Sequence, residues 1–104
     1  MLMPILDCKR VMFYSPADEA AFFRFAESIK AIRRTEGVRD SIVLHVASRI
    51  SHESLRDLIA LFERYRIRRM SQLAQFLSPS NRSWLADPKR FWYKKVFTDA
   101  TRRI

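Results

Sequence analysis

The stretch SIVLHVAS, residues 41–48, decides the fold. In an extended chain one face reads I-L-V at positions 42, 44 and 46, and the other reads V-H-A at positions 43, 45 and 47. A strand that is apolar on both faces is typical of the middle of a sheet or of an interface. The sequence therefore predicts a central strand here.

The segments around this strand predict a strand and two helices. KRVMFYS, residues 9–15, is rich in β-branched and aromatic residues and ends at Ser15-Pro16, which favours a first strand. Residues 15–32 have helical apolar spacing, with Ser15 as N-cap and Pro16 at the first helical position. Residues 50–67 repeat this pattern behind Ser51. The expected order is β-α-β-α.

A long connection between two consecutive strands suits a parallel crossover. We therefore expect a single α/β domain over residues 1–104, with a β-α-β-α core, a short parallel sheet and additional C-terminal helices. Two strands alone make a poor sheet. The third would come from the C-terminal segment or from a second subunit, which is the structural reason to expect a homodimer.

The C-terminal segment gives weaker signals. MSQLAQFL, residues 70–77, has the spacing of a short helix. Asp87 as N-cap and Pro88 after it favour a last helix over DPKRFWYKKVF, residues 87–97. The rival interpretation is a third strand over FWYKKVF, residues 91–97, in which Phe91, Tyr93, Lys95 and Phe97 alternate with Trp92, Lys94 and Val96. The aromatic residues of this region are expected to close a core first, and to stack on nucleic-acid bases only second.

Charge is distributed unevenly along the chain. Residues 1–63 hold nine basic and nine acidic side chains, whereas residues 64–104 hold eleven basic and two acidic, so the net charge of +9 arises in the last 41 residues. A one-sided basic surface attracts polyanions. The residues expected to bind nucleic acid are Arg66, Arg68, Arg69, Lys89, Arg90, Lys94 and Lys95, called here the C-terminal basic surface.

Few residues are candidates for catalysis, metal binding or phosphate binding. Cys8 would need a histidine beside it to act as a nucleophile, and His45 becomes its neighbour only if the two predicted strands pair. His52 and Asp57 belong to the ordinary polar face of a helix rather than to a metal site. One glycine in the whole chain argues against a phosphate-binding loop. We expect no enzyme activity, no cofactor and no metal.

The N-terminal MLMPILDCKR lacks a basic leader and a long apolar run, and no stretch approaches the length of a membrane span. With its single cysteine, the chain is expected to be a soluble, reduced, cytoplasmic protein. The resulting hypothesis is a small basic binding module that meets nucleic acid or an acidic protein through the C-terminal basic surface. The alternative is a protein-interaction or regulatory subunit with no nucleic-acid role.

Overall fold

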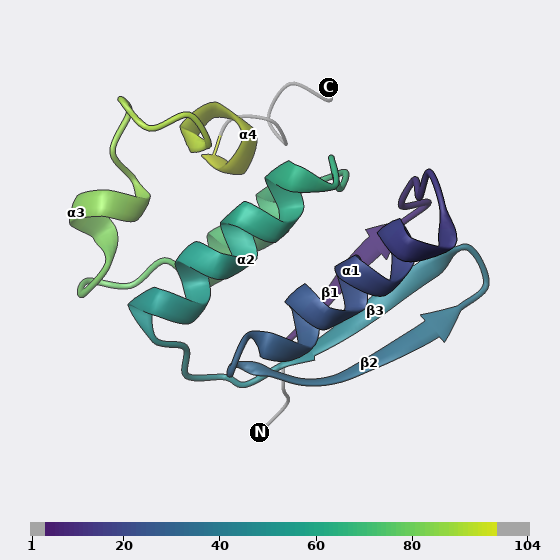
Figure 1. Cartoon of the computed structure of the whole chain (residues 1–104). Helices are drawn as coiled ribbons and strands as arrows, with labels where there is room; N and C mark the ends of the chain where they lie inside the picture. The colour runs from purple at the N-terminus through teal and green to yellow at the C-terminus, as the bar shows by residue number, and fades with distance from the viewer. Residues whose placement is uncertain (1–3, 98–104) are drawn as a thin grey trace. The chain divides into compact units, whose positions relative to one another are not determined.

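The structure, a computed structural model, describes residues 4–97 and divides the chain into two compact units, Met1–Arg68 and Arg69–Ile104. Figure 1 shows the elements of both units. In chain order the first unit contains β1 (Ile5–Lys9), α1 (Pro16–Ser28), β2 (Ile32–Val38), β3 (Ser41–Val46) and α2 (His52–Arg64). The second contains the 3-10 helix η1 (Met70–Phe76), α3 (Arg82–Leu85) and α4 (Tyr93–Phe97).

The central strand is confirmed as β3, but the predicted parallel sheet is wrong. The sheet has the order β1-β3-β2, and β3 pairs antiparallel with both neighbours. The pattern missed β2, which forms a hairpin with β3 through Arg39 and Asp40. This extra reversal of the chain turns β3 antiparallel to β1. It also supplies the third strand from within the chain, so the shortage of strands no longer argues for a dimer.

The first strand lies earlier than predicted. It covers Ile5–Lys9 instead of residues 9–15, with Leu6 opposite Leu44 and Cys8 opposite Ile42. Arg10 ends the strand because its backbone is left-handed, with a φ of 54°. Its N–H still donates to the carbonyl of Asp40 at 2.8 Å. Residues 11–14 therefore leave the sheet, although their composition suits a strand.

The first helix is confirmed but is shorter than predicted. The Ser15 hydroxyl accepts from the N–H of Asp18 at 3.1 Å, as expected of an N-cap. The helix ends at Ser28, because Ile29 is already extended. Ile32, the last residue of the predicted helix, instead begins β2. That strand is mostly exposed and charged, as edge strands often are, and so it lacks the apolar pattern of a buried strand.

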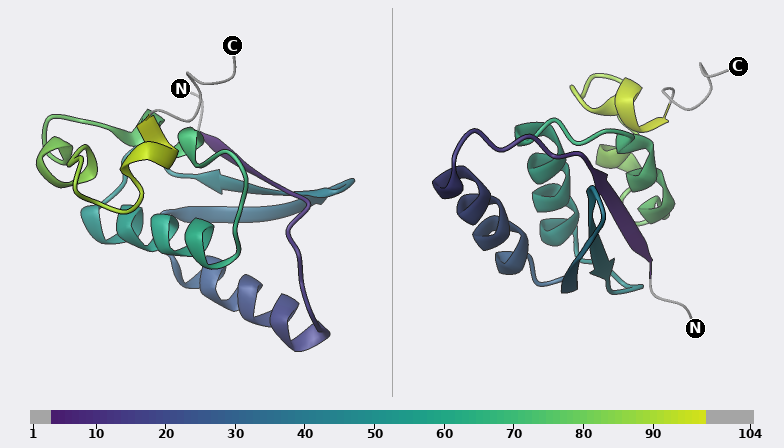
Figure 2. Two further views of the ribbon diagram at one scale, coloured as in Figure 1. Left: turned by 90° about the horizontal axis from the view of Figure 1, so that it is seen from above. Right: turned by 90° about the vertical axis from the view of Figure 1, so that its right-hand side faces the viewer.

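The core of the first unit lies between the sheet and two helices. Figure 2 shows α1 and α2 on the same face of the sheet. The second helix is confirmed, with the Ser51 hydroxyl accepting from the N–H of Ser54 at 3.0 Å. Phe22 of α1 and Phe62 of α2 are fully buried, as is Leu44 of β3. This packing fixes the two segments that carry the site described below.

In the second unit, Tyr93–Phe97 form the helix α4 and not a strand, although α4 covers only the last part of the helix predicted over residues 87–97. Trp92 and Val96 are buried, and the Trp92 indole donates to the carbonyl of Leu85 at 2.9 Å. The ring of Trp84 meets that of Trp92 edge-on at 6.1 Å. Both tryptophans therefore belong to a core, as expected, whereas Phe91 is 60% exposed.

Candidate functional site

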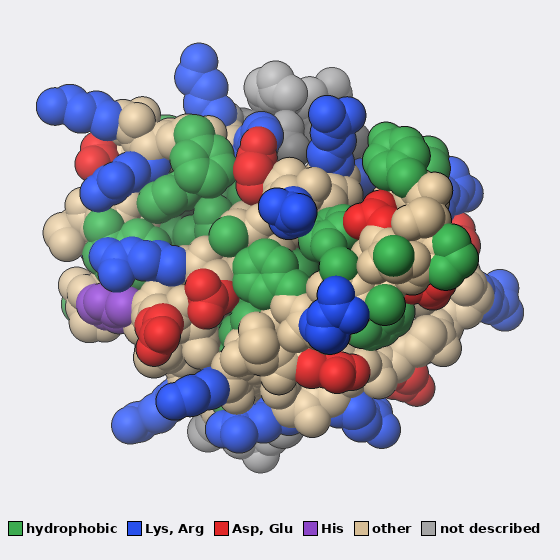
Figure 3. Space-filling view, in the orientation of Figure 1, with side chains coloured by type: hydrophobic (Ala, Val, Ile, Leu, Met, Phe, Trp, Pro, Cys, Tyr) green, Lys and Arg blue, Asp and Glu red, His purple; other side chains and the backbone are tan. Residues whose placement is uncertain are grey.

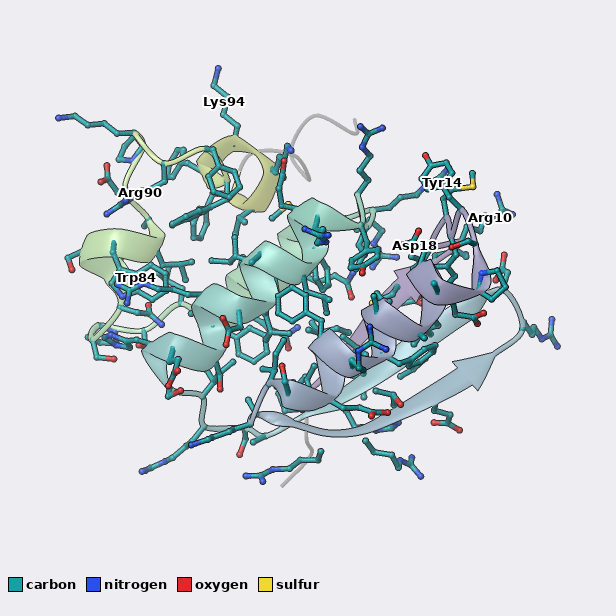
Figure 4. The ribbon with its side chains drawn as sticks, viewed as in Figure 1. Arg10, Tyr14, Asp18, Trp84, Arg90 and Lys94 are labelled. Carbon is teal, nitrogen blue, oxygen red and sulfur yellow. The ribbon has the colours of Figure 1, made fainter. Side chains whose placement is uncertain are left out.

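An open hollow of about 540 Å³ lies on the surface of the first unit. Two parts of the chain form it: the segment from the end of β1 to the first turn of α1, and the C-terminal end of α2 with the residues after it. Figure 4 shows Arg10, Tyr14 and Asp18 close together at the first of these. The lining residues are Arg10, Met12, Tyr14, Asp18, Arg64, Tyr65, Arg66 and Arg68, called here the arginine hollow.

Arg66 stands at the position that ends α2. Its N–H donates to the carbonyl of Glu63 at 3.2 Å, and the N–H of Ile67 donates to that of Phe62 at 2.9 Å. This pair of bonds is the Schellman motif, which requires a left-handed residue that is usually glycine. Arg66 takes this conformation with a φ of 52°. The chain therefore keeps a long cationic side chain at a position where glycine would be less strained.

Arg10 enters the arginine hollow from the other segment, also with a left-handed backbone. Its Nε donates to Oδ2 of Asp40, a residue of the β2–β3 turn, at 3.0 Å. This hydrogen bond holds the pKa of Asp40 below its usual value, so the pair stays ionised at neutral pH. The pair fixes the direction of the Arg10 side chain and neutralises part of its charge.

Tyr14 stands next to the N-cap of α1. Its backbone N–H donates to Asp18 Oδ2 at 3.0 Å, while the N–H of Asp18 donates to Ser15. The Asp18 carboxylate is therefore engaged with the backbone at the start of the helix, where negative charge is favourable. These bonds hold the backbone of Tyr14 and leave its side chain exposed.

The floor of the arginine hollow includes Tyr65, whose ring is buried. It meets the ring of Phe22 at 5.0 Å and that of Phe13 at 6.2 Å, both in edge-to-face geometry. Such contacts stabilise the packing of the two lining segments against each other. Phe13 and Tyr65 thus connect the β1–α1 segment to the end of α2.

The charge of the arginine hollow is positive. Four arginines line it against the single carboxylate of Asp18, and Asp40 engages Arg10 from outside. Within residues 4–97 neither Arg64 nor Arg66 has an acidic partner. Over α1 and β2, by contrast, basic and acidic side chains are interspersed (Figure 3). Basic side chains therefore outnumber acidic ones where the two lining segments meet.

The residues predicted to bind nucleic acid fall into both units. Arg66 and Arg68 line the arginine hollow, whereas Arg69 belongs to the second unit with a φ of 61°. Of the others in the second unit, Arg90 is engaged by Asp87 at 3.6 Å and lies 5.7 Å from the Trp92 ring centre. Lys89, Lys94 and Lys95 are exposed there. Arg102 and Arg103, which add to the C-terminal excess of charge, lie outside the described residues.

Sequence reasoning missed the part of the site that comes before α1. Arg10, Met12 and Tyr14 were assigned to a strand, in the half of the chain whose charges balance. Only the antiparallel pairing of β1 with β3 brings this segment toward the end of α2. The signal available in the sequence was the basic pair KR at residues 9–10, directly before an apolar segment.

The candidate catalytic pair does not form. Cys8 lies opposite Ile42, whereas His45 lies opposite Ile5. Burial, reinforced by the charge of Asp7, raises the pKa of the Cys8 thiol to about 12, so it is not a thiolate at neutral pH. His45 Nε2 lies 2.9 Å from Glu36 Oε1, and this hydrogen bond, with Arg34 nearby, lowers the pKa of Glu36.

Within residues 4–97, no three histidine, cysteine or acidic side chains are grouped so that they could hold a metal ion. None of the described helices is long and apolar enough to cross a bilayer. No protein-family model, no curated protein and no solved structure matches the chain.

Proposed function

We propose that the protein is a non-enzymatic nucleic-acid-binding module and that the arginine hollow is its contact site. The observation that carries the proposal is the gathering of four arginines around one open hollow. Guanidinium groups are suited to phosphate because they present several N–H donors in a fixed plane. The hollow replaces the C-terminal basic surface as the main contact, while retaining its members Arg66 and Arg68.

The conformation of Arg66 supports a functional role for its side chain. A left-handed backbone costs a residue other than glycine about 1–2 kcal/mol. Strained backbone conformations cluster at functional sites. Arg66 combines this strain with the absence of an acidic partner within residues 4–97. Binding of an anion gives a reason for arginine at this position.

The rest of the C-terminal basic surface is proposed to play a secondary part. Lys89, Lys94 and Lys95 raise the local concentration of nucleic acid without holding it in one orientation. The cytoplasmic location and an acidic protein as partner stay predictions. The alternative function, a protein-interaction subunit, has lost one of its two motives, the shortage of strands, because the sheet has three strands.

The proposal is tested with three triple variants that remove the same charge. R64Q/R66Q/R68Q neutralises the arginine hollow, R24Q/R33Q/R49Q neutralises exposed arginines elsewhere in the first unit, and K89Q/K94Q/K95Q neutralises three exposed lysines of the second unit. Binding of labelled oligonucleotides is measured against salt concentration. Each lost phosphate contact lowers the slope of log K against log salt by about 0.7–0.9.

We expect the hollow variant to lose binding at physiological salt and about two units of slope. The other two variants should stay close to the unchanged protein under that condition. Equal losses in all three variants would mean that only total charge matters, and the arginine hollow would then not be the contact site.

A further inference from the structure

We infer that the ligand of the arginine hollow is single-stranded nucleic acid, with one base stacked on the ring of Tyr14. This inference rests on the proposed function and narrows it to one class of nucleic acid. Tyr14 is 82% exposed and lies on the lining of the hollow beside Met12, which is 63% exposed. Exposed apolar side chains are common one at a time, so the argument depends on what holds these two in place.

The segment that carries Tyr14 is anchored at three points. Arg10 is tied to Asp40 at one end, and the backbone of Tyr14 is tied to Asp18 at the other. Between them Phe13 packs edge-on against Phe22 at 5.4 Å. Phe13 is only partly exposed, whereas its neighbours Met12 and Tyr14 are exposed. Anchoring through Phe13 therefore presents Met12 and Tyr14 to the solvent.

An aromatic ring held beside arginines matches how single strands are bound. Cations follow the phosphates, and aromatic side chains stack on the unpaired bases. In a duplex the faces of the bases are covered by their neighbours, so an exposed tyrosine gains no stacking partner. Arg64 and Arg66 would contact phosphates while Tyr14 contacts a base. The contact involves no base-specific hydrogen bond, so we expect little sequence preference.

The test compares two single strands of equal charge, an oligothymidylate and an abasic oligomer of the same length. Alanine in place of Tyr14 should weaken binding of the oligothymidylate about tenfold and leave binding of the abasic strand unchanged. Tyr14→Phe should bind as the unchanged protein does, because its ring is retained. Phe91→Ala, which removes an exposed ring of the second unit, is the matched control and should have no effect.

The outcomes separate the inference from the proposed function. If R64Q/R66Q/R68Q loses binding but Tyr14→Ala binds both strands normally, the arginine hollow stands and the stacking contact is overturned. If the triple variant binds normally, the proposed function itself is wrong. Tighter binding of a duplex than of either single strand would also overturn the inference. Thermal unfolding of Tyr14→Ala shows whether the variant is folded, and its binding of the abasic strand shows whether the arginine hollow is still intact.

Discussion

At the scale of single residues, the first unit places arginine where glycine is usual. Arg10, Arg39 and Arg66 all have left-handed backbones, while the chain's one glycine, Gly37, does not. Arg39 fills the first position of the two-residue β2–β3 loop, and Arg66 fills the left-handed position of the Schellman motif that ends α2. Two of the three line the arginine hollow. Strain and positive charge thus occur together at the candidate site.

Replacing Arg66 by glycine should raise the stability of the fold and weaken the binding of nucleic acid. Glycine adopts the left-handed conformation without steric cost, so we expect the free energy of unfolding to rise by about 1 kcal/mol. Binding of single-stranded DNA should weaken at the same time, because a guanidinium is lost. Urea unfolding and a binding titration on the same sample measure the two effects.

Arg24→Gly is the matched control for this prediction. Arg24 is exposed in the middle of α1, outside the arginine hollow, and glycine there should lower the free energy of unfolding by about 1 kcal/mol. Its effect on binding should be small. A loss of stability in Arg66→Gly comparable to that in Arg24→Gly would contradict the assignment of strain to Arg66.

Only part of the candidate site could be predicted from single residues. Arg66 and Arg68 belong to a basic run that is visible in the sequence, and both lie in the arginine hollow. Arg10 and Tyr14 come from a segment with balanced charge. Their place depends on the pairing of β1 with β3, which no local pattern encodes.

At the scale of elements, the helices could be predicted from N-cap residues and hydrophobic periodicity, whereas the pairing of the strands could not be predicted from the sequence. Ser15 and Ser51 could be predicted as N-caps because each hydroxyl accepts from a backbone N–H only three residues further along the chain. The strand β2 was missed because IRRTEGV is charged and exposed, and the end of the preceding helical pattern covered its first residue. Without β2 the chain lacked a reversal, and the sheet was predicted to be parallel.

The two serine caps allow a matched comparison. Ser15→Ala and Ser51→Ala should each lower the free energy of unfolding by about 1 kcal/mol, since each leaves a helix N–H without its hydroxyl acceptor. Only Ser15 is next to Tyr14. We therefore expect Ser15→Ala alone to weaken binding of the oligothymidylate, because it loosens the backbone that presents the ring.

Chemical denaturation and binding titrations on both alanine variants check this prediction. Equal binding by Ser15→Ala and Ser51→Ala, at similar losses of stability, would show that the cap of α1 does not help to position Tyr14.

At the scale of the whole molecule, the net charge of +9 acts at a distance. The screening length in about 0.01 M salt is about 30 Å, which is comparable to the size of a small domain, and it falls to about 8 Å at physiological salt. All twenty basic residues therefore contribute to the attraction of a polyanion at low salt. Only close contacts persist at higher salt.

We expect the association rate in about 0.01 M salt to fall to a similar degree in the three triple variants, because steering depends on total charge. The equilibrium affinity of the hollow variant should differ from that of the other two most at low salt, since a protein with fewer phosphate contacts has a shallower salt dependence. Stopped flow and equilibrium titrations measure the two quantities, and a hollow variant that associates much more slowly than the other two at low salt would mean that total charge does not govern steering.

The order of the strands also bears on how the site is built during folding. Strands β2 and β3 are joined by two residues, whereas the pairing of Ile5 with His45 closes a loop that contains α1 and β2. Contacts distant in sequence are entropically costly and tend to form late. The β1–α1 segment, with Arg10 and Tyr14, would then join the end of α2 only after the folding barrier is crossed. A bound single-stranded oligonucleotide should therefore slow unfolding and leave the folding rate unchanged, which the two arms of a chevron plot would reveal.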